Sequence, residues 1–234
     1  MKAWQTETGR KALLHSFIEG FCACRKGALI TAADYGFHVT LYDSSSRSSE
    51  YFACEPVSNE LLTKLKPKEW LTIVGDVDRL MPSGQTGLKV LVDELFMLAD
   101  IAALEQSPDD IEACLVSDPA RIAAFNASGE ISAFQPNDRS FLFAVVVDGS
   151  VAATARYGVA ADGDIVVDRV STAPTFRRRG LARRVMTALA AHAARQGHRR
   201  AVLISSDQGE PLYRSLGYQP VVPVRVFVTA VPEP

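Results

Sequence analysis

Cysteines are few in this chain, and strongly apolar runs are short. The four cysteines, at positions 22, 24, 54 and 114, show no disulfide framework. On a helix, the sulfurs of Cys22 and Cys24 would point to nearly opposite sides, which argues against a metal site. The apolar run from Phe141 to Val147 is far shorter than a membrane span, and the N-terminus lacks an apolar signal core. We therefore expect a cytoplasmic protein with no bound metal and no membrane partner.

Acidic residues are absent from one long stretch of the sequence. Between Arg169 and Ser206 there is no Asp or Glu, whereas nine arginines lie there. The whole chain is slightly acidic, with 25 basic and 27 acidic residues, so this positive charge is local. A local cluster favours one anionic ligand and argues against a nucleic-acid partner.

An Arg/Gly turn lies inside this basic stretch, and a helix with one apolar stripe follows it. The stripe residues recur every four positions: Leu181, Val185, Leu189 and Ala193. Gly180 and Ala182 leave the backbone accessible where the helix begins, so its unpaired N–H groups and positive dipole end can bind an anion. The turn therefore predicts a diphosphate site, and Gly197 is expected to end the helix.

Two motifs in the second half of the chain follow one another in a characteristic order. Arg177-x-x-Gly180-x-Ala182 comes after an apolar run that ends in Val-Ser-Thr, and Glu210-Pro-Leu-Tyr-Arg-Ser-Leu-Gly-Tyr218 comes later. Together they resemble the GNAT superfamily of acyl-CoA-dependent N-acetyltransferases, with Ala182 in place of the more frequent second glycine. The resemblance implies a GNAT domain at residues 106–234. Its fold would be an α/β fold with a mixed sheet and a V-shaped opening where two parallel strands part.

The resemblance also implies roles for individual residues. Backbone amides of the Arg/Gly turn would hold the pyrophosphate of coenzyme A, and the end of the preceding strand would pair with the pantetheine arm. Tyr213 falls on the family's usual proton donor to the departing thiolate. The implied cofactor-binding residues are Val170, Ser171, Thr172, Arg177, Arg178, Arg179, Gly180, Leu181, Ala182, Arg183 and Ser206.

Acyl transfer from a thioester to an amine needs a neutral amine, a polarised carbonyl and a proton for the leaving sulfur. With a reference pKa of about 10, Tyr213 is protonated at neutral pH and can act as an acid. A strand N–H near Val170 can stabilise the developing oxyanion. His192 and His198 are interpreted as surface residues. The general base is left open among Asp168, Asp207, Glu210, these two histidines and a water relay.

Residues 1–105 are predicted to form another α/β domain. The expected elements are a helix over 11–25, strands within 28–42 and over 51–54, a short helix capped by Ser58, and a strand over 70–74. Residues 88–98 fit no single element type, and 107–110 are typical of a linker. This order of elements resembles a degenerate GNAT half. Because no Arg/Gln-x-x-Gly-x-Gly/Ala turn occurs in it, only the C-terminal half is expected to be active.

The second half is predicted in more detail. Asp118 is expected to cap a helix over 119–126. Three strands over 140–147, 151–159 and 164–172 are expected to form an antiparallel meander. A strand over 201–205, a short helix around Tyr213 and a final strand over 221–231 complete the expected order.

These patterns predict an acyltransferase: an acetyl-CoA-dependent N-acetyltransferase that acts in a ternary complex on a primary amine of a small molecule or an amino acid. One alternative is a non-catalytic acyl-CoA-binding sensor or scaffold protein, which would bind the coenzyme without turnover. Another is a nucleotide-binding α/β domain that uses the same turn for a different phosphate ligand. The sequence has neither the Gly-x-Gly-x-x-Gly of Rossmann enzymes nor the Gly-Lys-Ser/Thr of a P-loop, which argues against that alternative.

Overall fold

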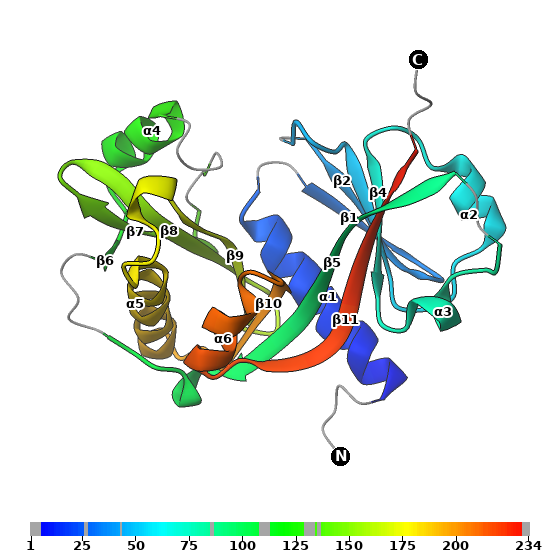
Figure 1. The fold of residues 1–234 in the computed structure, drawn as a ribbon. Helices are drawn as coiled ribbons and strands as arrows, with labels where there is room; N and C mark the ends of the chain where they lie inside the picture. Colours follow the sequence, from blue (N-terminus) through cyan, green and yellow to red (C-terminus); the bar gives the residue numbers. More distant parts are fainter. Residues whose placement is uncertain are drawn as a thin grey trace.

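One sheet of eleven strands runs through the whole protein (Figure 1), in the order β1-β2-β3-β4-β11-β5-β10-β9-β8-β7-β6. The computed structural model describes residues 6–25, 28–42, 44–84, 87–107, 113–128, 134 and 137–230. The sheet contains both parallel and antiparallel pairs, with helices packed against it. The predicted α/β fold with a mixed sheet is confirmed. Within the described residues, no helix is long and apolar enough to cross a membrane.

The second half of the chain forms one end of this sheet. Its strands are β6 (Ala113–Leu115), β7 (Ser140–Val147), β8 (Ser150–Val159), β9 (Ile165–Thr172) and β10 (Arg200–Ser206). Its helices are α4 (Pro119–Ser128), η3 (Pro174–Phe176), α5 (Leu181–Arg195) and α6 (Glu210–Leu216). Strands β7, β8 and β9 form the predicted antiparallel meander. The side chain of Asp118 accepts from the Ala120 N–H at the start of α4, as its predicted capping role requires.

The first half and the last strand form the other end of the sheet. The helices are α1 (Glu7–Ala23), α2 (Asn59–Lys64), α3 (Val77–Leu80) and η2 (Ile101–Ala103). The strands are β1 (Ala28–Ala33), β2 (Gly36–Leu41), β3 (Ser49–Ala53), β4 (Glu69–Val74), β5 (Leu88–Asp100) and β11 (Gln219–Thr229). The ambiguous segment 88–98 is therefore part of the long strand β5. Of the predicted linker 107–110, residues 108–110 lie outside the described residues.

The two ends of the sheet interleave at its centre. Strand β5, from the first half, pairs with β10 and β11, and strand β11, from the second half, pairs with β4 and β5. Outward from this centre the strand pattern repeats, because β3–β4 and β9–β10 are parallel whereas β1–β2–β3 and β7–β8–β9 are antiparallel. The division at residue 105/106 and the descent of the first half from a GNAT unit stay predictions.

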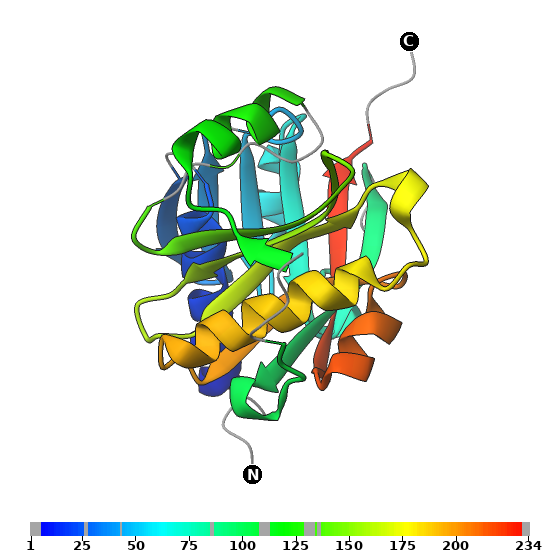
Figure 2. The ribbon, with the colours of Figure 1, turned by 90° about the vertical axis from the view of Figure 1, so that its left-hand side faces the viewer.

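Helix α1 lies against strands from both ends of the sheet (Figure 1), and α5 covers the opposite face of the second half (Figure 2). The α1 face is an apolar core that includes Phe17, Phe52, Phe96 and Val202. Helix α1 can approach β8 closely because Gly158 has no side chain. A Cβ placed on Gly158 would lie 2.0 Å from the Gly20 carbonyl oxygen. The first helix of the chain therefore packs directly against the strands of the second half.

Candidate functional site

The start of α5 presents an uncapped and exposed backbone. Its N-cap Gly180 has the left-handed conformation, with φ of 74°, and supplies no side-chain hydrogen bond to the helix. The first helical bond there runs from the Arg184 N–H to the Gly180 carbonyl at 3.1 Å. The N–H groups that precede Arg184 in the first turn have no partner within the helix. A Cβ on Gly180 would meet nothing within 4 Å, so this turn is open to a ligand.

The arginines of the turn lie around this helix start. Arg177, Arg178 and Arg179 are exposed, and the Arg177 Nε donates to the Thr172 carbonyl at 3.3 Å. Arg183 instead turns its guanidinium to the Glu105 carboxylate and to the Ser215 hydroxyl, the latter at 2.7 Å. The guanidinium of Arg183 is thus occupied. The exposed arginines give the turn its positive surroundings.

Strands β9 and β10 separate soon after they meet. Their parallel pairing is confined to Ala201 with Ile165 and Val202 with Val166. Beyond these pairs β10 continues beside β5, while β9 follows β8 through a register shift near Arg169, which has a φ of 54°. The predicted residues Val170, Ser171 and Thr172 follow this bulge, on the part of β9 that β10 has left. The bulge itself was not predicted, since an arginine gives no local signal for a left-handed conformation.

Tyr213 lies in α6 beside this opening. Its ring is buried, and a Cβ on Gly209 would lie 2.8 Å from the ring, so the glycine makes room for it. Burial, and secondarily the Asp168 carboxylate, raise the pKa of Tyr213 to about 12. Tyr213 therefore keeps its proton throughout the neutral pH range and can donate it.

A cleft of about 550 Å³ connects Tyr213 with the first half of the chain. From the second half it is lined by Val167, Asp168, Arg169, Val170, Ile204, Ser206, Tyr213 and Val226. From the first half it is lined by Phe17, Phe21, Arg25, Ser46, Arg47, Glu50, Phe52, Trp70, Thr72, Leu91, Val92 and Glu94. The cleft brings together the predicted residues Val170, Ser206 and Tyr213. The sequence analysis named no residue of the first half for this cleft, because no motif marks them.

Two buried carboxyl groups in the cleft wall, those of Asp168 and Glu50, are paired with arginines. Asp168 accepts from Arg156 at 2.6 and 2.9 Å, and it pairs with Arg25, which follows α1, at 3.2 Å. Although burial opposes the charge, these arginines hold the pKa of Asp168 well below its usual range. Glu50 pairs with Arg47 at 2.8 Å and accepts from the Thr72 hydroxyl. The Arg47 guanidinium also lies 4.3 Å from the centre of the Trp70 ring.

The candidate general bases of the sequence analysis have different surroundings in the structure. Asp168 is held as an ion-paired carboxylate, Glu210 pairs with Arg214 at 2.6 Å, and Asp207 is exposed. The interpretation of His192 as a surface residue is wrong. Its ring is buried and hydrogen-bonded to the Tyr157 hydroxyl at 2.7 Å, because α5 turns this side of the helix toward the sheet. Burial lowers the pKa of His192.

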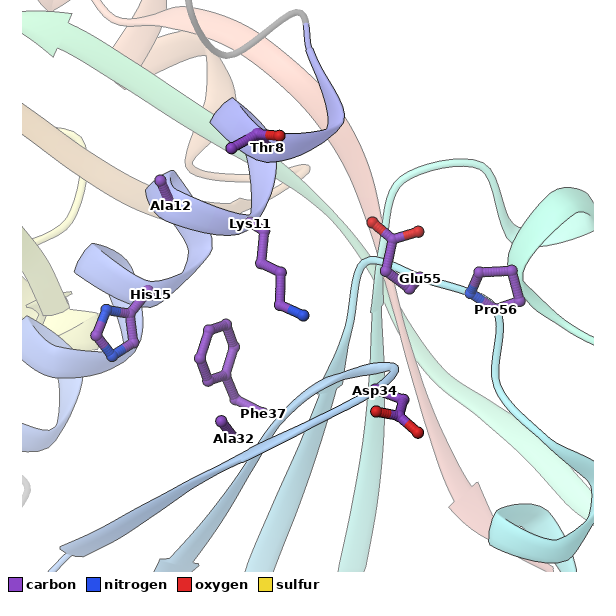
Figure 3. A pocket seen from close by; sticks show the side chains of 9 residues that line it. All are labelled: Thr8, Lys11, Ala12, His15, Ala32, Asp34, Phe37, Glu55 and Pro56. Atoms are coloured by element: carbon purple, nitrogen blue, oxygen red, sulfur yellow. The ribbon is translucent and has the colours of Figure 1, made fainter.

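A second hollow, of about 900 Å³, lies between α1 and the β1–β2 hairpin (Figure 3). Lys11 and His15 of α1 face Phe37 and Asp34 across it, and His15 stacks on Phe37 with ring centres 5.0 Å apart. None of the predicted site residues lines this hollow. The hollow is therefore separate from the predicted coenzyme site.

Comparisons with known proteins extend these observations. The sequence model of the acetyltransferase (GNAT) family matches residues 105–218. A GCN5-related N-acetyltransferase from Kribbella flavida is 20% identical, with a TM-score of 0.67, and the similarity covers 94% of this chain and 95% of that one. A putative GNAT acetyltransferase from Novosphingobium aromaticivorans is 22% identical, with a TM-score of 0.57 and coverage of 87% and 92%. No curated protein matches this chain significantly. At these identities the solved structures show a shared fold, and they share it over nearly the whole chain.

Proposed function

Because residues 105–218 form a domain of the acetyltransferase (GNAT) family, we propose that this protein is an acetyl-CoA-dependent N-acetyltransferase. Its acceptor is a primary amine of a small molecule or an amino acid. The observation that carries the proposal is the opening between β9 and β10, which has the uncapped start of α5 and the buried Tyr213 beside it. Family membership supports acyl transfer in general, and these residues support the specific reaction.

The residues at the α5 start fit the diphosphate of coenzyme A. N–H groups at a helix N-terminus bind phosphate oxygens well, and the helix dipole adds to the attraction. The exposed Arg177, Arg178 and Arg179 supply positive charge, and Gly180 brings no side chain between the phosphates and the backbone. The β9 backbone at Val170–Thr172 is the matching edge for the pantetheine arm, with Ser206 across the opening on β10. When bound, acetyl-CoA supplies the activated acetyl thioester.

Tyr213 and the bulged part of β9 perform the two remaining tasks of the transfer. A β9 N–H near Val170 donates to the carbonyl oxygen as negative charge develops there. Tyr213 gives its proton to the sulfur as the C–S bond breaks. The amine forms the new C–N bond directly, in a ternary complex, so that no acyl group rests on a side chain of the enzyme.

The charges of the cleft favour a compact acceptor. Its lining contains three arginines, Arg25, Arg47 and Arg169, and three carboxyl groups, Glu50, Glu94 and Asp168. A concentrated acidic surface would suit the basic tail of a protein substrate, whereas this cleft is electrically balanced. A small amine, including an amino acid, fits it better. The proposal includes neither a nucleic acid nor a membrane as partner, and it keeps the cytoplasm as the place of action.

The test is thiol release from acetyl-CoA in the presence of a panel of primary amines. The panel contains amino acids, arylalkylamines, polyamines and a lysine-containing peptide. We expect release that depends on at least one small amine, with the acetylated amine detected by mass spectrometry. Tight acetyl-CoA binding without release across the panel would contradict the enzyme and favour the acyl-CoA-binding sensor. Competition of ATP or NAD with coenzyme A would favour a nucleotide-binding protein.

A further inference from the structure

The geometry points to Glu94 of β5 as the catalytic base that takes a proton from the acceptor amine, which enters the cleft from the α1 face of the sheet. This inference rests on the proposed function and deepens it. Glu94 lies in the first half of the chain, outside the GNAT domain at residues 105–218. The first half would then supply a reacting group as well as a wall.

Strand register places Glu94 at the mouth of the opening. On β5 it is paired with Ser206, the last residue of β10. Residues directly opposite in an antiparallel pair have Cβ atoms about 5 Å apart. At this level β10 has already parted from β9, so Glu94 lies one strand away from the gap, and on its other side it is paired with Val224 of β11. Tyr213 lines the same cleft, seven residues after Ser206 along the chain.

Glu94 and Tyr213 belong to opposite faces of the sheet. Alternation along β5 puts Glu94 on the same face as Phe96, which packs in the core under α1. Tyr213 belongs to the core on the α5 face. The cleft touches both residues, so it passes through the sheet at the gap between β9 and β10. A thioester approached from the α5 start can thus meet an amine that arrives from the α1 face.

The other carboxyl groups of the cleft are already engaged. Asp168 is paired with two arginines, and Glu50 is paired with Arg47 and bonded to Thr72. The side chain of Glu94 has no hydrogen bond or ion pair with any other residue in the described part of the chain. It is half-buried in the cleft wall. Glu94 is therefore the carboxyl group of the cleft that remains available to an incoming ammonium ion.

The surroundings of Glu94 also suit proton transfer. Burial and the neighbouring Glu50 carboxylate raise the pKa of Glu94, and the positive charge of Arg47 opposes this rise. The other charged or titratable groups that line the cleft around it are Arg25 just after α1, Asp168 and Arg169 of β9, and Tyr213 of α6. A carboxyl group whose pKa is shifted toward neutrality is a stronger base than an ordinary surface glutamate.

The proton balance of the transfer closes with these two residues. Glu94 accepts one proton from the ammonium form of the acceptor and later releases it to solvent. The nitrogen lone pair forms the C–N bond, and the C–S bond breaks with its electron pair on sulfur. Tyr213 protonates that sulfur. The second proton that the nitrogen loses returns through water to Tyr213.

The test compares wild type with Glu94→Gln, which keeps the shape and removes the base. We expect kcat/KM at neutral pH to fall about 10²-fold to 10³-fold, while the Kd for acetyl-CoA stays within about twofold. The wild-type rate should fall as the pH drops through the raised pKa of Glu94, and this acidic limb should disappear in Glu94→Gln. The matched control is Asp93→Asn, because Asp93 is exposed and pairs with Arg225.

A second variant keeps the test decisive if Glu94→Gln folds poorly. In Glu94→Ala, added formate should restore part of the lost turnover, whereas it should not affect Asp93→Asn. An active wild type with an unchanged pH profile in Glu94→Gln, or no formate rescue of an inactive Glu94→Ala, would overturn the assignment of Glu94 alone. A wild type that binds acetyl-CoA and turns over no amine would overturn the proposed function and this inference together.

Discussion

The two halves of the sheet share a strand pattern but differ where their parallel strands meet. In the first half, β3 and β4 stay paired over five positions, from Ser49 with Glu69 to Ala53 with Ile73. In the second half, β9 and β10 pair at two positions and then separate. A continuous ladder leaves no room for a ligand, whereas the separated strands open a gap through the sheet. The same pattern is thus closed at one end and open at the other.

The helices that follow these strands differ in the same sense. Helix α2 is six residues long, and the Ser58 hydroxyl accepts from the Leu61 N–H at its start at 3.2 Å. Helix α5 is fifteen residues long, begins after arginines and has no side-chain cap. A serine cap uses up a backbone donor that an anion would otherwise bind. The comparison teaches that an anion site depends on how a helix starts as well as on where it lies in the fold.

The largest expected effect comes from closing the open helix start. Gly180→Asp places a negative side chain, in a left-handed conformation, where the phosphates of coenzyme A would lie. We expect acetyl-CoA binding to be abolished in isothermal titration. Gly149→Asp is the control, because Gly149 also has a positive φ and open space around it but lies in the β7–β8 turn. Normal binding by Gly180→Asp would show that the coenzyme lies elsewhere.

Removing the hydroxyl of Tyr213 tests the chemistry at the opening. Tyr213→Phe should lower kcat by about 10²-fold to 10⁴-fold and leave the Kd for acetyl-CoA nearly unchanged. Tyr218→Phe is the matched control, since the two rings lie 5.8 Å apart and Tyr218 is fully buried. Undiminished turnover by Tyr213→Phe would reduce this residue to a packing role.

The ion pair between Arg25, just after α1, and Asp168 of β9 tests how the first helix is attached to the second half. Asp168→Asn removes the buried carboxylate that Arg25 and Arg156 share, which should lower the free energy of unfolding by about 3 to 5 kcal/mol in urea titrations. The exposed pair of Asp93 with Arg225 is the contrast, and Asp93→Asn should cost less than about 1 kcal/mol. Equal losses of stability in Asp168→Asn and Asp93→Asn would show that the buried ion pair contributes no more than the exposed one.

The same carboxylate predicts a pH dependence of stability. Because the folded-state pKa of Asp168 is lowered, its contribution is fully present above the ordinary aspartate pKa of about 3.9. The contribution is lost progressively as the pH falls below that value toward the folded-state pKa. Wild type should therefore lose more stability on acidification than Asp168→Asn, as measured by thermal unfolding at a series of pH values.

The smallest expected effect comes from opening the closed helix start of the first half. Ser58→Ala removes the cap of α2 and should cost about 1 kcal/mol of stability. Turnover and acetyl-CoA affinity should not change, because β3 and β4 remain paired beside it. A change in coenzyme affinity would show that the first half takes part in coenzyme binding after all.

Local signals predicted much of the second half and one helix cap in the first half. The four-residue spacing of Leu181, Val185 and Leu189 marked α5, and all three side chains are buried against the sheet. Ser58 and Asp118 act as the helix caps that their positions indicated. Such features depend on residues a few positions apart, so they can be recognised in the sequence. The turn at Arg177–Gly180 is also a feature of neighbouring residues and could be recognised in the same way.

Other parts of the site depend on contacts between distant segments. Segment 88–98 gave no clear period because β5 is covered differently along its length and pairs with β10 and β11. His192 looked like a surface residue because its bond to Tyr157 joins residues 35 positions apart. Glu50 and Glu94 carry no motif, and only the folded sheet brings them to the cleft.

The sequence by itself determined the order of the strands and α-helices from β7 to β11, the basic turn before α5 and the place of Tyr213 in a short helix, because each follows from neighbouring residues. The tertiary structure alone decided that β9 and β10 part after two pairs and that β5 and β11 cross between the halves. It also decided that carboxyl groups of the first half face the opening. Strand pairing joins residues far apart in the chain, so the energy that selects it is not recorded in any local pattern.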